Sequence, residues 1–359
     1  MHVSVAVQSD SLADDEARVR RIVEDRLAIE VTALEPLAEG LGLRRFFRVH
    51  TGGLPASLIV RIETEEDPAG RPAGIPPEPG LEPTRTFLAE HGVPVPLHFG
   101  GEVGLDLLED LGTTSLARAV ADADPCERRA LYEEACDLVP RLQKAGFDRS
   151  LAVPAFGRRL DAAVFAYKAE LFAEWSLPEA LGRPAASAER RLVSEAFTAV
   201  AELARGAPQR LAHRDFQSAN LYVRSDRRPG HRLAVIDFQG ALLAPPEYDL
   251  VCLLRDSYLE LADVEVAALI QRIRPRLPDR PDTAEFQRRF DALTLTRKGK
   301  DHARFLYAAR TRGDRRFLPF LPATARYLKA ASARCADADP RFSRLDELIQ
   351  RLPESPCAG

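Results

Sequence analysis

The chain has 359 residues, of which 45% are hydrophobic and 29% are charged, and its net charge at pH 7 is -4. A chain of this length fits two lobes or domains rather than one small core, and its composition is that of an ordinary globular protein. The slightly negative charge excludes a general attraction to nucleic acid.

Cysteine usage and hydropathy predict a cytoplasmic protein. The cysteines have no metal-ligand spacing and leave an odd one over, which favours a reducing compartment without structural disulfides; they are Cys126, Cys136, Cys252, Cys335 and Cys357. No apolar run approaches the roughly 20 residues of a membrane span. Residues 1–15 are polar and lack the basic-then-apolar order of a signal peptide. We therefore expect no membrane partner.

The first third of the chain predicts one helix and then a sheet. Apolar residues recur at helical spacing over residues 12–29. Strands are expected at residues 34–37, 46–50, 56–62, 97–100 and 104–112. Between Pro68 and Pro83, six prolines and three glycines predict a flexible excursion, and a short helix is expected at residues 84–90.

From Ser115 onward the pattern becomes helical. Leu131, Ala135, Leu138 and Leu142 recur at intervals of four and three residues, which predicts one buried helix face. Further helices are expected at residues 158–174, 190–203, 248–261, 264–273, 284–292 and 317–331. The tail at residues 334–359 is polar, and we expect it to be expendable to chemistry.

The most informative residues are Asp215, Asn220 five residues later, and Asp237 directly behind an apolar strand. Two short strands, residues 221–224 and 233–236, are joined by a polar link and predict a hairpin. Both acids would therefore sit at the rims of adjacent strands, close enough to share a metal cluster.

These three side chains are the groups that phosphoryl transfer requires. Asp215 would accept a hydrogen bond from the attacking hydroxyl and hold it in line. Asn220 would offer an amide oxygen to Mg²⁺, a hard cation that prefers oxygen ligands, and Asp237 would bridge the metal and the phosphates. A lone Asp before a strand is usually a turn residue, and a lone His213 is usually a core residue, but the full pattern favours the catalytic interpretation.

The segment resembles the aminoglycoside phosphotransferase family, relatives of the eukaryotic-like kinases. Within it, the chain is most similar to bacterial cell-wall amino-sugar kinases, which phosphorylate N-acetylmuramate and N-acetylglucosamine at the anomeric hydroxyl. The narrower match lies at residues 236–241, 245–258 and 286–327, and the resemblance spans about 34–328. It implies an α+β, bilobal protein-kinase-like fold, with an N-terminal antiparallel β lobe (1–111) and a mainly helical C-terminal lobe (112–359). It also implies ATP and Mg²⁺ as cofactors and a role in peptidoglycan recycling.

The resemblance assigns phosphate contacts to the N-terminal lobe. Gly40 and Gly42 would lie in a loop whose backbone N–H groups approach the phosphates; a plain hairpin turn is the alternative. The family usually has Gly-Asp-Ala-Ser before Arg-x-Tyr-Tyr-Arg, and only the second part is well matched here, at residues 44–48.

Arg61 stands where kinases carry the lysine that grips the α- and β-phosphates. Arginine keeps the charge, but the exchange is not conservative, and a solvent-facing strand residue is an equal alternative. Its carboxylate partner would be Glu82, with Glu78 as the second candidate. The adenine edge would pair with the backbone of Glu109, Asp110 and Leu111, or this segment is an ordinary strand end.

Around the catalytic loop, the resemblance makes His213, Arg214 and Asp249 supporting residues, with Asp249 orienting the loop. Arg255 and Asp256 look exposed beside an apolar stripe. They would contact sugar hydroxyls or pair with each other, and charged helix residues favour the pairing.

Three other functions remain open. The same fold phosphorylates aminoglycosides, choline or homoserine. A non-catalytic nucleotide-binding module is the second alternative, since the glycine loop departs from the family pattern, although such a module has no need of Asp215, Asn220 and Asp237 together. A protein kinase is disfavoured because no Ala-Pro-Glu-like segment follows Asp237-Phe238.

Overall fold

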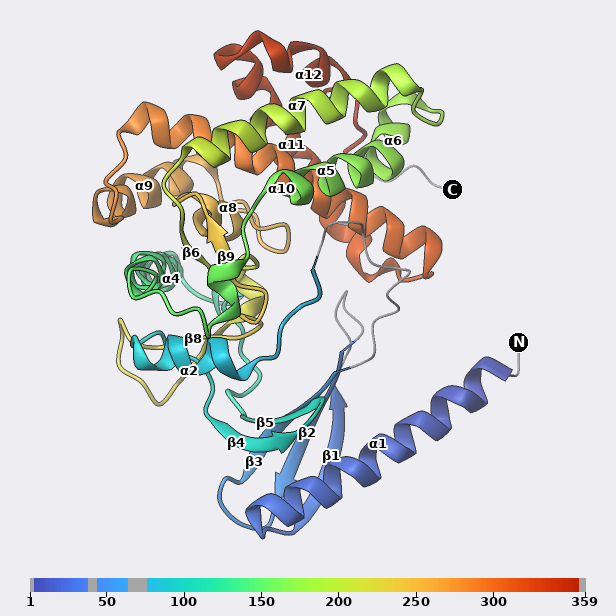
Figure 1. Ribbon diagram of the computed structural model, residues 1–359, viewed down its shortest axis with the longest axis vertical. Coiled ribbons are helices and arrows are strands. Elements are labelled where there is room, and N and C mark those ends of the chain that lie inside the picture. The colour runs from blue at the N-terminus through green and yellow to red at the C-terminus, as the bar shows by residue number, and fades with distance from the viewer. Residues whose placement is uncertain (1–2, 38–43, 64–75, 355–359) are drawn as a thin grey trace. The chain divides into compact units, whose positions relative to one another are not determined.

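The computed structural model describes residues 3–37, 44–63 and 76–354 (Figure 1). The chain forms two compact units, Met1–Arg71 with Pro96–Gly112, and Pro72–Val95 with Thr113–Gly359. Residues 72–95 join the second unit because Val235 N donates to Pro94 O and Arg141 Nη1 donates to Gly92 O. The functional lobes 1–111 and 112–359 stay a prediction.

The first unit contains a helix and an antiparallel five-stranded sheet in the order β1-β2-β3-β5-β4. Its elements are α1 (Val3–Leu27), β1 (Val31–Leu37), β2 (Arg45–Thr51), β3 (Ser57–Ile62), β4 (His98–Glu102) and β5 (Leu105–Glu109). This sheet confirms the predicted antiparallel β lobe.

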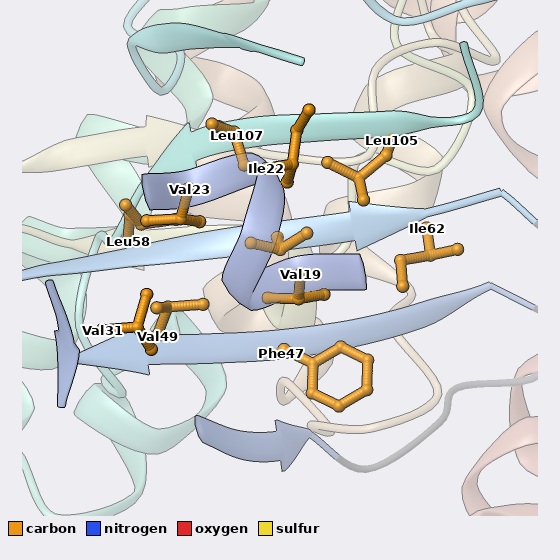
Figure 2. Packing of buried hydrophobic residues seen from close by; sticks show 11 residues of the cluster. Val19, Ile22, Val23, Val31, Phe47, Val49, Leu58, Ile62, Leu105 and Leu107 are labelled. Carbon is orange, nitrogen blue, oxygen red and sulfur yellow. The ribbon is translucent and has the colours of Figure 1, made fainter. Parts of the chain in front are cut away.

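A single apolar cluster joins α1 to one face of this sheet (Figure 2). Alternate strand residues point to the same face, and helix residues three or four apart share a side. The cluster consists of Val19, Ile22, Val23, Val31, Phe47, Val49, Leu58, Val60, Ile62, Leu105 and Leu107. The apolar residues that alternate along the strands and those that recur along the helix therefore pack in one core.

The second unit is mainly helical. Its helices are α2 (Glu82–Glu90), α3 (Leu116–Ala121), α4 (Pro125–Ala145), α5 (Ala162–Leu171), the π-helix η3 (Phe172–Ser176), α6 (Leu177–Leu181), α7 (Ser187–Gly206), α8 (Tyr248–Leu254), α9 (Asp263–Ile273), α10 (Thr283–Thr311), α11 (Leu321–Ala338) and α12 (Ser343–Ile349). Short 3₁₀ turns lie at Pro154–Gly157, Ser218–Asn220, Arg274–Arg276, Arg315–Phe320 and Pro340–Phe342.

Two small antiparallel sheets position the predicted catalytic segment of this unit. β6 (Arg210–Ala212) pairs with β9 (Leu242–Ala244), and β7 (Leu221–Val223) pairs with β8 (Leu233–Val235). The second pair confirms the predicted hairpin.

Several expected elements differ in extent from those observed. The helix expected at 248–261 ends at Leu254, and just beyond it Asp256 accepts hydrogen bonds from the distant Ser218 N and from Tyr258 N. The helix expected at 284–292 continues to Thr311. Its second part contains charged residues that interrupt the apolar periodicity of the sequence, but in the structure these residues are buried and paired. The polar tail contains α12, which buries Leu345 and Ile349.

Within the described residues, no helix has both the length and the apolar character needed to cross a membrane. The four cysteines of the described chain, Cys126, Cys136, Cys252 and Cys335, carry free thiols.

Candidate functional site

Asp249 fixes the backbone that follows β6. From the first turn of α8, its carboxylate accepts hydrogen bonds from His213 N (2.7 Å) and Arg214 N (3.1 Å). The His213 imidazole Nε2 lies 2.9 Å from Ile236 O, which ties this loop to the end of β8. Burial raises the pKa of Asp249 to about 6, against the opposing effect of His213 and the backbone donors.

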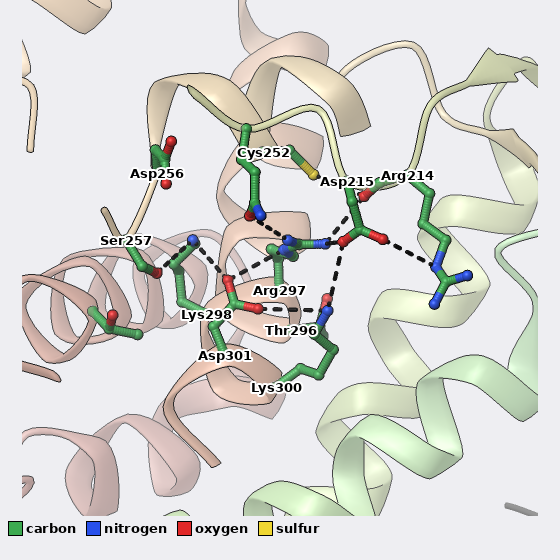
Figure 3. A network of polar contacts seen from close by, with 12 residues as sticks. Arg214, Asp215, Cys252, Asp256, Ser257, Thr296, Arg297, Lys298, Lys300 and Asp301 are labelled. Atoms are coloured by element: carbon green, nitrogen blue, oxygen red, sulfur yellow. Dashed lines mark hydrogen bonds and ion pairs between the residues drawn. The ribbon is translucent and has the colours of Figure 1, made fainter. Parts of the chain in front are cut away.

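The loop places the Asp215 carboxylate among three cations (Figure 3). Its Oδ1 accepts a 2.7 Å hydrogen bond from Arg297 Nη1 and lies 3.9 Å from Lys300 Nζ. Its Oδ2 lies 3.5 Å from Arg214 Nε. Burial would raise the pKa of Asp215, but Arg297, Lys300 and Arg214 together hold it well below its usual value. The carboxylate is therefore ionised at physiological pH.

Asn220 and Asp237 lie on segments that are bonded to the same loop. Asn220 Nδ2 donates to Asp215 O (2.9 Å), and Ile236 N donates to Asn220 O (3.0 Å). Gln239 Nε2 donates to Asp237 Oδ1 at 2.6 Å. Asp237 has a φ of +61°, a left-handed conformation that is uncommon for residues other than glycine. Such strained positions concentrate at functional sites.

Glu78 connects the two acidic segments. One of its oxygens accepts from Arg214 Nη1 (2.8 Å) and the other from Gln239 Nε2 (3.4 Å). A Cβ added at Gly240 would lie 2.8 Å from Arg214 Nη1 and 3.1 Å from Glu78 Oε1, so a larger residue would require the ends of these two side chains to shift. A continuous polar chain thus runs from Asp215 to Asp237.

The sequence interpretation missed the contribution of α10. Arg297 also donates to Arg214 O (3.1 Å) and Gln217 Oε1 (3.3 Å), so one buried guanidinium braces the loop at several points. Asp301 accepts from Arg297 Nε (3.2 Å) and Lys298 Nζ (2.9 Å). The available signal was the run of charges at residues 297–301 in a segment that the family resemblance already covered.

The residues predicted to contact the nucleotide have mixed outcomes. Gly40 and Gly42 lie outside the described residues. Arg61 is 3% exposed and pairs with Asp106 at 2.7 Å and with Glu63, so the solvent-facing alternative is wrong. Its nucleotide role stays a prediction.

The expected carboxylate partners of Arg61 have other contacts. Glu82 pairs with Arg85 (2.6 Å), and Glu78 accepts from Arg214 of the Asp215 loop. Glu109 N donates to Leu97 O within the sheet, and Asp110 pairs with Arg48 at 2.8 Å. An adenine contact by the 109–111 backbone stays a prediction.

Arg255 and Asp256 are buried, which corrects the expectation that they are exposed. The favoured pairing between them is also replaced by other partners. Arg255 pairs with Asp263 (2.7 Å), and its guanidinium lies 5.2 Å from the Tyr327 ring centroid. Asp256 accepts from Ser218 N at 2.7 Å. The Asp256 contact supports the segment that follows Asp215, and a substrate contact by either residue stays a prediction.

Comparison with known proteins relates this geometry to a family. A model of the phosphotransferase enzyme family matches residues 33–286. A protein of Neisseria meningitidis named N-acetylmuramate/N-acetylglucosamine kinase is 31% identical over 72% of this chain and 75% of its own length. A Pseudomonas aeruginosa protein of the same name is 28% identical over 89% of each chain.

Solved structures share the fold at low identity. Choline kinase LicA from Streptococcus pneumoniae has a TM-score of 0.58 and 14% identity, covering 90% of this chain and 99% of its own. A thermostable mutant of aminoglycoside phosphotransferase APH(4)-Ia, in a ternary complex with ADP and hygromycin B, has a TM-score of 0.52 and 15% identity, covering 94% and 97%. These neighbours confirm the predicted protein-kinase-like fold. Because the family model covers most of the sequence, the chain belongs to the phosphotransferase enzyme family and is an enzyme that transfers phosphate.

Proposed function

We propose that the enzyme transfers the γ-phosphate of ATP to the anomeric hydroxyl of N-acetylmuramate or N-acetylglucosamine, in cytoplasmic peptidoglycan recycling. The observation that carries the proposal is the bonded arrangement of Asp215, Asn220 and Asp237 described above. The acceptor sugars follow from the names of the two relatives, which align over most of the chain.

In this proposal Asp215 orients the acceptor. Its carboxylate accepts a hydrogen bond from the anomeric hydroxyl, which attacks the γ-phosphorus; the new O–P bond forms as the β–γ bridge breaks and ADP leaves. The hydroxyl proton passes to Asp215 or to the transferred phosphate. Because the cations around Asp215 lower its pKa, it is a weak base, and orientation is its main contribution.

The residues present fit a magnesium ion. Mg²⁺ usually keeps several waters and takes one or two carboxylates together with substrate phosphates. The Asn220 amide nitrogen is bonded to Asp215 O, so its oxygen is oriented away from that contact, and Gln239 fixes the Asp237 carboxylate. Asn220 and Asp237 would therefore hold the ion, which neutralises charge on the phosphates when bound. Gly40, Gly42, Arg61, Glu82 and the 109–111 backbone remain proposed nucleotide contacts.

A coupled ADP-release assay with ATP and Mg²⁺ tests the proposal. Its acceptors would be N-acetylmuramate, N-acetylglucosamine, choline, homoserine and an aminoglycoside. We expect turnover with the amino sugars. Turnover with another acceptor alone would overturn the sugar assignment, and ATP binding without turnover on any acceptor would indicate a non-catalytic module.

Asp215→Asn should lower kcat by about 10²–10⁴-fold, because it removes the charge that orients the hydroxyl. The dissociation constant of ATP with Mg²⁺ should stay within about twofold, since no nucleotide contact is lost. Asp226→Asn, on an exposed pair with Arg227, is the matched control and should keep wild-type kcat. Full activity of Asp215→Asn would remove this residue from the mechanism.

A further inference from the structure

One face of α10 extends the positive charge beside Asp215. Arg297, Lys300, Arg304 and Tyr307 follow at intervals of three, four and three residues, so they share a helix side; we call these four residues the α10 stripe. Figure 3 shows Arg297 and Lys300 pointing to Asp215. The stripe ends at Tyr307, whose ring packs edge-to-face on Trp175 at 5.2 Å. Three cationic side chains and one aromatic ring are thus aligned along one side of α10.

The carboxylates around the stripe do not balance its cations. Asp301 lies 3.2, 2.9 and 3.5 Å from Arg297, Lys298 and Lys300, and Asp215 is shared by Arg297, Lys300 and Arg214, so two carboxylates face four cations. Within the described part of the chain, half-buried Arg304 has no ion-pair or hydrogen-bond partner.

A buried lysine adds to this excess. Lys168 is 2% exposed, lies 3.4 Å from Tyr248 Oη and sits over the rings of Phe165 and Tyr248, with no carboxylate partner among the residues described. Burial, with repulsion from Lys300 and Arg297, lowers the pKa of Lys168 to about 7. Since buried charge is normally paired, an anionic ligand would complete the cluster.

The two carboxylate oxygens of Asp215 face different neighbours. Asp215 Oδ2 faces Arg214, which continues through Glu78 to the Asp237 segment. Asp215 Oδ1 faces Arg297 and Lys300 of α10. When the hydroxyl of an acceptor is bound at Asp215, the rest of the acceptor would therefore lie against the α10 stripe.

We propose that Lys300 and Arg304 bind the carboxylate of an acidic amino-sugar acceptor and make the enzyme prefer N-acetylmuramate to N-acetylglucosamine; this rests on the proposed function. The two sugars differ by an ether-linked carboxylic acid. About one helix turn, 5.4 Å, separates Lys300 from Arg304 on the same side of α10, so the two cations can bind one carboxylate. Lys300 Nζ lies 3.9 Å from Asp215 Oδ1, which places this pair beside the acceptor hydroxyl. Arginine and lysine supply charge-assisted hydrogen bonds to a carboxylate.

The test compares kcat/KM for N-acetylmuramate and for its primary amide, which has the same shape without the charge. The wild type should prefer the acid by about 10- to 100-fold, as expected for a hydrogen bond to a charged group. Arg304→Gln should reduce this preference to the part that Lys300 supplies, and Arg304→Lys should restore part of the loss. Arg310→Gln, an exposed residue of the same helix paired with Glu179, is the control and should keep the wild-type ratio.

The outcomes separate the two proposals. Equal wild-type kcat/KM for acid and amide overturns the carboxylate site while the kinase assignment stands. An equal loss on both acceptors in Arg304→Gln also overturns it, because the stripe would then serve the transferred phosphate. No wild-type turnover on any amino sugar overturns the proposed function itself.

Discussion

Asp215 is held in place by a residue of a distant helix. Its partner Arg297 is 82 positions away in the sequence and only 3% exposed. Removing one member of a buried ion pair leaves an uncompensated charge, which costs about 3–5 kcal/mol. The geometry of the proposed catalytic carboxylate therefore depends on α10 as well as on its own loop.

Lys300 predicts an alkaline limit to activity. Burial, then repulsion from Arg297, lowers the pKa of Lys300 to about 8. Lys300 is charged below that pH and loses its proton as the pH rises through 8, which removes a cation from Asp215 and from the α10 stripe. We expect kcat/KM for N-acetylmuramate to fall above about pH 8 in steady-state assays.

Lys300→Arg tests whether Lys300 causes this fall in kcat/KM at alkaline pH, because arginine keeps its charge across the pH range of the assay. The alkaline limb should move to higher pH in this variant. An unchanged limb would assign the titration to another group. Lys329→Arg, at a partly exposed lysine that pairs with Glu354, is the matched control and should leave the profile as in the wild type.

Individual residues can be predicted from the sequence when a short motif identifies their role. Asp215, Asn220 and Asp237 lie within one motif and are recognisable from their spacing. Arg297 could not be assigned to Asp215 in this way, because tertiary packing alone brings them together. The burial of Arg255 was missed for the same reason, since its partner Asp263 and the Tyr327 ring lie outside its helix.

Helix α10 shows why element boundaries are harder to predict than element types. Its first part has recognisable apolar spacing, whereas Arg297, Lys298 and Asp301 look like a solvated face in the sequence. In the structure these residues are buried in one polar network. Hydrophobic periodicity detects only apolar burial, so the rest of the helix was not predicted.

Gly299 sets how closely α10 approaches its neighbours. A Cβ at this position would lie 3.2 Å from ring atoms of both Phe172 and Phe197. Alanine would gain about 1 kcal/mol of helix propensity, but overpacking costs typically about 1–3 kcal/mol, and two buried rings in contact have little freedom to move. We expect Gly299→Ala to lower the free energy of unfolding by about 1 kcal/mol in urea denaturation.

Gly206 at the end of α7 provides the matched control. A Cβ there would meet nothing within 4 Å, so Gly206→Ala should be neutral or slightly stabilising. If Gly299→Ala were as stable as Gly206→Ala, the close approach of α10 to the two rings would not constrain the fold.

For the molecule as a whole, residue patterns predicted individual strands and helices, and the family resemblance predicted how they are arranged. The antiparallel sheet follows from that resemblance, whereas helical spacing predicted most of the second unit. The contacts of residues 72–95 with the second unit could not be predicted, because they arise from single hydrogen bonds such as Val235 N to Pro94 O. The role of the polar tail was also hidden, since only Leu345, Leu348 and Ile349 of α12 are apolar.

The tail is expendable to the proposed chemistry but not to the fold. Helix α12 contacts α6, α7 and α11, and Leu345 is fully buried there. Leu345→Ala removes apolar contacts and leaves a cavity, so we expect a loss of about 2–5 kcal/mol in unfolding free energy and a melting temperature lower by several degrees. Exposed Arg344→Ala is the control and should melt like the wild type. Because α12 supplies none of the proposed site residues, the kcat of Leu345→Ala should match the wild type when it is measured well below the melting temperature of the variant. A large loss of kcat in the folded variant would show that the tail supports the site directly.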